Sequence, residues 1–299
     1  MLITPKRILW ILCLLSISAI SAQTVVNGFF PKKNELTVAS SYSSKSYDNF
    51  YRGEILTPGN PANMGEISSS IYSIYGEYGI LDWLSASANM PYISIENETG
   101  ALDPVQGVSQ VDGIQDLNVF FKAKILEKSF KNASKIAIGG ATGVTVPVGG
   151  YEEAGILSLG SGATVVDGCG FVQFTTSSNL FVELQAMYSL KNNSDFDVPD
   201  AFVYSAKLGY YNNWFYAHAK IGVQNSLSGF DIGSQAFVDA GGAAALPETE
   251  VDFANVYFDL YVPLYKKTLG VSSGYAINMD GQNYNKESSF SLGLVYTVR

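Results

Sequence analysis

The stretch Ser289–Val298, SFSLGLVYTV, decides the fold. Its large apolar side chains alternate with small or polar ones and belong to Phe290, Leu292, Leu294, Tyr296 and Val298. Alternate side chains of a strand point to opposite faces, so one face of this stretch is apolar and carries no charge. A strand of about ten residues is long enough to cross a bilayer at a tilt. The stretch therefore predicts one strand of a transmembrane β-barrel.

The same two-residue period recurs in further segments of similar length. The predicted strands lie near residues 35–43, 67–80, 83–95, 114–126, 135–148, 163–176, 180–190, 202–211, 214–227, 251–264, 269–278 and 289–298. An even number of strands leaves both termini of the barrel's chain on one side of the membrane, as in bacterial single-chain barrels. The predicted fold class is all-β: a transmembrane, antiparallel, up-and-down β-barrel of about 12 strands built from residues 35–299.

Short and long connections alternate along the chain, which supports this prediction. The short turns are Leu81-Asp82, Ser177–Asn179, Asn212-Asn213 and the one near Lys266-Lys267. The long connections are residues 44–66, 96–113, 149–162, 191–201, 228–250 and 279–288, and Glu127–Ser134 is the one intermediate case. Outer-membrane barrels have short periplasmic turns and long outer loops. The aromatic residues beside the short turns predict a periplasmic girdle, formed by Tyr78, Trp83, Tyr210, Trp214 and Tyr265.

Residues 1–22 are predicted to be a signal peptide that is removed on export. Lys6 and Arg7 precede the apolar run Ile8–Ile20, and Ile20-Ser21-Ala22 fits a cleavage site. Without Lys6 and Arg7 the balance is 16 basic against 27 acidic residues, a net charge of −11, which argues against a nucleic-acid partner. The expected location is the outer membrane of a Gram-negative bacterium.

The charged face of each strand is predicted to point into the lumen, because charge on the lipid face costs a few kcal/mol at the bilayer midplane. The candidate pore-lining residues are Glu77, Lys122, Lys124, Glu183, Lys207, His218, Lys220 and Asp259, with Asp167 and Cys169 on the same side. Two interpretations remain open. These charges either pair across a filled interior, or line a hydrated passage whose selectivity they tune.

Small residues on two predicted strands indicate free volume inside the barrel. The inward positions of strands 135–148 and 269–278 are glycine, alanine, serine, threonine or asparagine. Water, a solute or a plug can occupy that space, and the segment 23–34 is one candidate plug. The long loops carry many carboxylates, which we expect to be solvated: Glu96, Glu98, Asp103, Glu152, Glu153, Asp195, Asp197, Asp200, Asp231 and Asp239.

The sequence gives little support for an active site. His218 is the one histidine, and it is predicted to face the lumen, whereas a lipid substrate would approach from the bilayer. No G-x-S-x-G turn occurs near it, and one His with one Cys is too few for a metal centre. We therefore expect no catalytic residue, no metal and no cofactor.

Three stretches carry a resemblance to a known family. They are Tyr78–Leu84 (YGILDWL) continuing to Met90-Pro91-Tyr92, Gly113–Asn118 (GIQDLN) and Gly143–Gly149 (GVTVPVG). In this order they resemble outer-membrane channel-like proteins described as transporters of the phenol meta-degradation pathway. The resemblance implies a barrel that admits small, often hydrophobic compounds.

The expected function is therefore a passive channel or uptake porin for small, hydrophobic or aromatic solutes. Its expected gate is formed by outer loops, chiefly 44–66 and 228–250. The expected partners are outer-membrane lipid and lipopolysaccharide, the barrel-assembly machinery and a small-molecule solute. Two alternatives remain: a closed structural or adhesive barrel that binds surface lipid or a partner, and a lipid-modifying enzyme dependent on His218.

Overall fold

The computed structural model describes residues 26–60, 62–265 and 268–299, and in it one large antiparallel sheet closes on itself. The closing pair is β1 (Leu36–Tyr47) with β15 (Ser288–Val298), in register from Leu36 opposite Val298 to Ser46 opposite Ser288. The predicted β-barrel is confirmed. The predicted signal peptide and the turn at Lys266-Lys267 lie outside the described residues.

The strands of the wall agree closely with the predicted segments. After β1 they are β4 (Ile67–Leu81), β5 (Leu84–Asn97), β6 (Gln110–Ile114), β7 (Asp116–Ser129), β8 (Lys135–Pro147), β9 (Thr164–Thr175), β10 (Leu180–Asn192), β11 (Ala201–Tyr211), β12 (Tyr216–Ser226), β13 (Asp252–Tyr265), β14 (Leu269–Gln282) and β15. Each of these strands pairs with the next around the barrel, except that β6 and β7 both pair with β5.

The predicted strand 114–126 is interrupted at Gln115, and its two parts, β6 and β7, both pair with β5. Opposite the interruption lies Pro91, whose oxygen accepts a hydrogen bond of 3.0 Å from the Gln115 N–H. Proline has no N–H to donate, so a regular ladder cannot continue there and one extra residue is accommodated. Counted as one strand, β6 and β7 bring the described wall to twelve strands.

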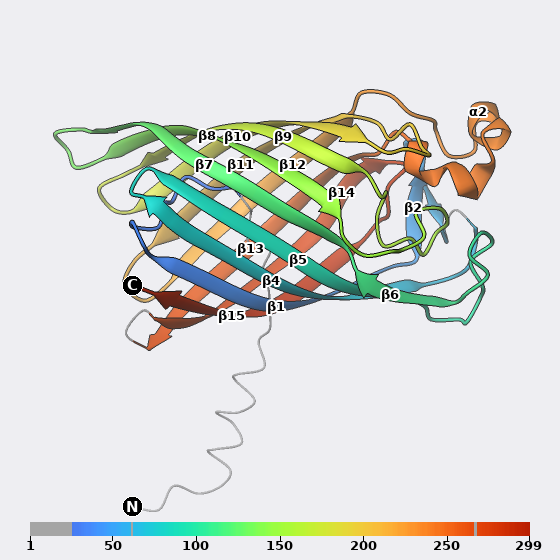
Figure 1. Cartoon of the computed structure of the whole chain (residues 1–299), viewed down its shortest axis with the longest axis horizontal. Coiled ribbons are helices and arrows are strands. Elements are labelled where there is room, and N and C mark those ends of the chain that lie inside the picture. Colours follow the sequence, from blue (N-terminus) through green and yellow to red (C-terminus); the bar gives the residue numbers. More distant parts are fainter. Residues whose placement is uncertain (1–25, 61, 266–267) are drawn as a thin grey trace, which may run out of the picture.

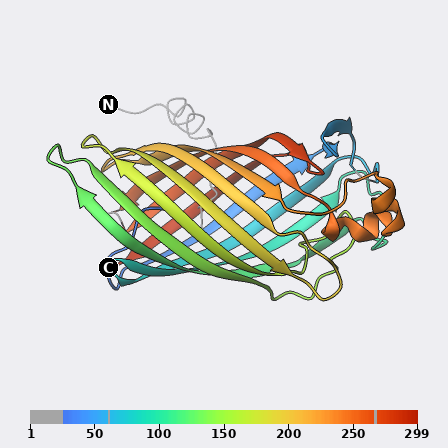
Figure 2. The same cartoon turned by 90° about the horizontal axis from the view of Figure 1, so that it is seen from above.

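The two ends of the barrel differ (Figures 1 and 2). The short turns gather at the end where the C-terminus lies, and the long connections gather at the other end. Two of the long connections contain structure that the alternation of side chains did not predict. Residues 44–66 include the hairpin β2 (Asn49–Arg52) and β3 (Ile55–Pro58), and residues 228–250 include α2 (Gln235–Asp239) and the 3-10 helix η1 (Gly242–Glu248). We call these two ends the periplasmic and the outer end.

The wall is apolar outside and charged inside. On β11, Leu208 is 53% exposed while its neighbour Lys207 is 2% exposed. On β7, Phe121 is 50% exposed and Lys122 is 2% exposed. A protein in water places such residues the other way round, so this distribution fits a barrel surrounded by lipid.

None of the helices in the described ranges is long and apolar enough to cross a membrane.

Candidate functional site

The lumen contains a buried ion pair between two neighbouring strands. Glu183 on β10 and Lys207 on β11 are register partners, and Lys207 Nζ lies 2.7 Å from Glu183 Oε1. Both side chains are almost completely buried. Gln185 Nε2 also donates to Glu183 Oε1 at 2.7 Å. The burial of two charges requires such partners, because the desolvation cost is otherwise several kcal/mol per ion.

A second ion pair spans a strand. Lys122 Nζ on β7 lies 3.0 Å from Glu77 Oε1 on β4, with β5 between them. Ser85 on β5 donates its hydroxyl to the same Glu77 oxygen at 2.9 Å. Two residues along β7, Lys124 Nζ lies 2.9 Å from Glu127 Oε2.

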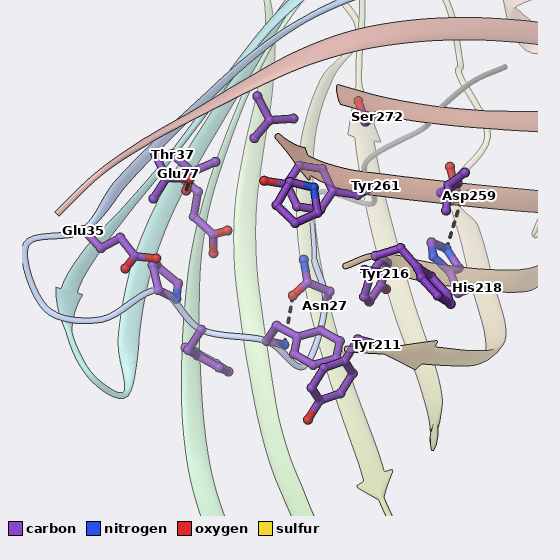
Figure 3. A pocket seen from close by; sticks show the side chains of 18 of the residues that line it. Asn27, Glu35, Thr37, Glu77, Tyr211, Tyr216, His218, Asp259, Tyr261 and Ser272 are labelled. Carbon is purple, nitrogen blue, oxygen red and sulfur yellow. Dashed lines mark hydrogen bonds and ion pairs between the residues drawn. The ribbon is translucent and has the colours of Figure 1, made fainter. Parts of the chain in front are cut away.

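The third pair joins His218 on β12 to Asp259 on β13. The two residues are register partners, and His218 Nε2 lies 3.0 Å from Asp259 Oδ2 (Figure 3). The alignment is not that of a hydrogen bond, and within the described residues His218 Nδ1 is buried without a hydrogen-bond partner. His218 therefore has a ring nitrogen whose hydrogen-bonding capacity no described protein atom satisfies. Two residues along β12, Lys220 places its Nζ 4.0 Å from the centre of the Tyr257 ring.

The segment before β1 makes polar contacts with these charged groups. The Gly28 N–H donates to Glu183 Oε2 at 2.6 Å, and Lys122 Nζ donates to the Phe29 carbonyl at 2.6 Å. Gln185 Nε2 donates to the Val26 carbonyl at 3.0 Å. Main-chain groups of residues 26–29 thus serve as partners for lumenal side chains of β7 and β10.

Aromatic packing adds to these contacts. The Phe29 ring lies edge-on to Phe181, Tyr211 and Tyr216, with centroid separations of 5.1, 5.5 and 5.7 Å. Edge-to-face pairs at these separations stabilise by about 0.5–1.5 kcal/mol each beyond the area they bury. Lys122 Nζ lies over the Phe30 ring, 4.5 Å from the ring centre.

A cavity of about 550 Å³ lies on one side of this segment (Figure 3). It extends from Arg299 and Asn213 at the periplasmic end to the side chains of His218 and Asp259. We call it the acidic chamber, because its charged lining is Glu35, Glu77, Asp259 and Arg299, with His218. Tyr75, Tyr261 and Phe29 supply aromatic lining.

A second cavity of about 490 Å³ lies on the other side of the segment. We call it the lysine chamber, since Lys32, Lys124 and Lys135 line it together with Asp82 and Glu127. Phe29, Phe30 and Pro31 line both chambers.

The free volume predicted from small residues is only partly present. On β14, Ser272 lines the acidic chamber, as the prediction requires. On β8, however, a side chain at Gly139 would meet the Phe171 ring, and one at Gly143 would meet the Phe120 ring. Val26 packs with both phenylalanines in one buried cluster. The space expected along β8 is therefore filled by rings from the neighbouring strands and by the N-terminal segment.

The outer end is covered by loops that pack on one another, and we call this assembly the outer cap. Asn283 is its main connector. Asn283 Oδ1 accepts the N–H groups of Ile232 and Gly53 at 2.9 and 3.0 Å, and its Nδ2 donates to the Glu250 carbonyl at 2.6 Å. Phe50, Ile232 and Phe237 form a buried cluster beside it. The two loops predicted to form the gate, 44–66 and 228–250, are thus joined.

Asp103 connects two further loops of the outer cap. Its Oδ2 accepts the N–H groups of Ile156 and Leu157 at 2.6 and 2.8 Å, and its Oδ1 accepts that of Val105 at 2.8 Å. The prediction that Asp103 is solvated is wrong, since only 1% of it is exposed. With the Gln106 N–H, which donates to Oδ1 at 3.1 Å, four backbone donors replace its water and offset the cost of burying the carboxylate.

Tyr284 lies beneath the outer cap, in the connection from β14 to β15. Its ring stacks on Phe253 with centroids 4.6 Å apart, and its hydroxyl donates to Glu287 Oε1 at 3.0 Å. Burial and the nearby Glu287 carboxylate raise the pKa of Tyr284 well above its usual value. The hydroxyl therefore stays protonated as a hydrogen-bond donor at neutral pH.

A family model described as "Putative MetA-pathway of phenol degradation" matches residues 71–275. The chain belongs to this family. The match runs from β4 to β14 and so includes most of the wall and the lumenal pairs of β7 and β10–β13. The family suggested by the three sequence motifs is thereby confirmed.

One solved structure has the same architecture. The COG4313 outer membrane channel from Pseudomonas putida F1 has a TM-score of 0.67 at 14% identity, over 93% of this chain and 100% of that chain. The NanC porin has a TM-score of 0.49 at 11% identity, over 87% of this chain and 98% of that one. No curated protein sequence is significantly similar to the chain. The fold is that of an outer-membrane β-barrel. The apolar outer wall of this chain agrees with the predicted location in the outer membrane.

Proposed function

We propose that the protein is a passive outer-membrane channel for small solutes, without chemistry of its own. The observation that carries this proposal is the acidic chamber, a cavity of about 550 Å³ enclosed by the barrel wall. Tyr75, Tyr261 and Phe29 offer apolar surface there, while His218 offers an unsatisfied ring nitrogen. Small aromatic or hydrophobic compounds that carry one polar group fit such a lining.

The geometry of His218 supports transport and not lipid modification. Its close neighbour is Asp259, and both side chains are buried on the lumenal face. A lipid would reach the barrel from the outside, where Leu208 and Phe258 are exposed. The proposed role of His218, and of the other seven charged residues named from the sequence, is to line or support the lumen.

The outer cap is the proposed gate. Asn283 joins loops 44–66 and 228–250, which would have to separate when the channel opens. Asp103 joins loops 96–113 and 149–162. The proposed partners of the protein are lipid and lipopolysaccharide around the wall, and the barrel-assembly machinery during insertion.

Planar-bilayer recording of the purified protein tests the proposal. We expect discrete, small conductance steps, together with uptake of small aromatic solutes into proteoliposomes. A silent barrel that also excludes these solutes would contradict it. That outcome would instead favour the closed structural barrel, which the packed clusters of the outer cap make the one serious competitor.

A further inference from the structure

The segment of residues 26–34 separates two cavities in the periplasmic half of the lumen. Phe29, Phe30 and Pro31 line both the acidic chamber and the lysine chamber. The remaining lining of the two cavities comes from different parts of the wall. The acidic chamber is lined by β1, β4 and β11–β15, and the lysine chamber by β7, β8 and β9.

The segment is attached at both of its described ends. At the inner end, Val26, Gly28 and Phe29 are held by Gln185, Glu183 and Lys122 through main-chain hydrogen bonds. At the rim, the Asn34 N–H donates to the Gly79 carbonyl at 2.7 Å, and the Lys33 N–H donates to Asp82 Oδ1 at 2.9 Å. Five such bonds and the Phe29 cluster describe a fixed partition, not a loose tail.

The partition also separates charge. Three carboxylates line the acidic chamber, from Glu35, Glu77 and Asp259. Arg299 pairs with Glu35 at 2.8 Å and Lys122 with Glu77 at 3.0 Å, so Asp259 is the lining carboxylate that has only His218 as its ion-pair partner among the described residues. Three lysines, Lys32, Lys124 and Lys135, line the lysine chamber against two carboxylates. The segment further covers Lys122, whose ammonium donates to the Phe29 carbonyl. Wall charges of one sign raise the local concentration of the opposite ion.

We propose that residues 26–34 divide the lumen, and that the acidic chamber is the solute path and favours cationic over anionic solutes. The acidic chamber is the path because it is the larger and reaches the unsatisfied His218 nitrogen in the wall. The segment is thus a selectivity element as well as a constriction. This inference rests on the proposed channel function, which the experiments below test separately.

Thiol labelling tests the partition without any need for conduction. Cys169 packs against the cluster of Val26, Phe120 and Phe171. In the intact protein in lipid vesicles, a charged methanethiosulfonate reagent should label Cys169 slowly. Deletion of residues 26–31, or the milder pair Phe29→Ala and Phe30→Ala if the deletion does not fold, should raise the labelling rate several-fold. Equal rates in well-folded variants, judged by heat-modifiable gel mobility, would overturn the partition.

Reversal potentials in a salt gradient test the selectivity. Asp259→Asn removes a charge from the acidic chamber, and the matched control Glu127→Gln removes one from the lysine chamber. We expect the intact channel to prefer cations, Asp259→Asn to reduce that preference, and Glu127→Gln to leave it unchanged. Equal shifts, or a shift with Glu127→Gln alone, would refute the assignment of the path.

The deletion of residues 26–31 can be used in the labelling test and in the selectivity test. It should increase the conductance and abolish the cation preference, because the lysine side of the lumen then faces the same passage. If the intact protein and the deletion are both silent, the channel function fails, while the labelling result still decides the partition. If only the deletion conducts, the segment is a complete plug and the side path is wrong.

Discussion

Lys207 Nζ lies 2.7 Å from Glu183 Oε1 inside the barrel, and neither side chain has more than 1% of its surface exposed. The same carboxylate accepts the N–H of Gly28. One ion pair therefore connects two strands of the wall to the segment that occupies the interior.

Breaking this pair on one side should be costly. Lys207→Met leaves Glu183 charged and buried without its cation, for which we expect a loss of about 3–5 kcal/mol in the free energy of unfolding. Denaturant unfolding in lipid vesicles measures it. The double variant Glu183→Leu, Lys207→Met should lose less than Lys207→Met alone, and Lys131→Met, on the exposed β7–β8 turn, serves as the control. A double variant as unstable as the sum of its parts would contradict a coupled pair.

A charge placed on the outer wall should be penalised according to its depth. Ile221 faces outward in the middle of β12, so Ile221→Lys should destabilise the barrel by about 2–4 kcal/mol. Leu180 faces the same side near a periplasmic turn, where the cost falls to about 0–1 kcal/mol. Unfolding in vesicles compares the two variants. If Ile221→Lys were tolerated as well as Leu180→Lys, this part of the wall would not lie in hydrocarbon.

Loss of the Asn283 side chain should loosen the outer cap. Asn283 has a positive φ of 51°, so Asn283→Gly removes the hydrogen bonds without backbone strain. We expect faster proteolysis within residues 228–250 and longer open times in bilayer recordings. Asn132→Gly, in the β7–β8 turn at the opposite end, is the matched control and should change neither. Unchanged protease sensitivity in Asn283→Gly would show that the side chain does not hold the loops together.

Two glycines should respond differently to the same substitution. A Cβ atom at Gly139 would meet the Phe171 ring and the Ala123 carbonyl, whereas one at Gly168 meets nothing within 4 Å. Gly139→Ala should therefore cost about 1–3 kcal/mol, the usual penalty for overpacking. Gly168→Ala should be neutral or slightly stabilising, because alanine suits a strand better than glycine. Comparable losses in both variants would mean that the β8 wall is not filled by Phe171.

The wall could be predicted from the sequence because its rule is local. The two-residue period of β15 and β7 requires only that neighbours alternate, and that rule separates Phe121 from Lys122 without knowledge of the rest of the fold. The break at Gln115 follows from Pro91 on another strand. No period within one strand contains that information.

The interior was harder to predict because its volume is shared between strands. Gly139 and Gly143 indicated space along β8, yet Phe171 and Phe120 come from β9 and β7 to occupy it. Asp103 was expected to be solvated because it lies in a polar loop, but two of its four backbone donors come from another loop, 149–162. The contacts of Gly28 with Glu183 likewise join residues that only the closed sheet brings together.

The seam between β1 and β15 has a consequence for biogenesis. β1 pairs with β4, which follows it closely in the chain, but the partner of its other edge is β15, the last strand of the wall. Closure of the barrel is therefore the last pairing step of folding, however early the other hairpins form. Residues 26–34 come just before β1 and can bind to the inner face of the sheet before the sheet closes. The wall would then close around the partition, and the segment would not have to thread into a finished barrel.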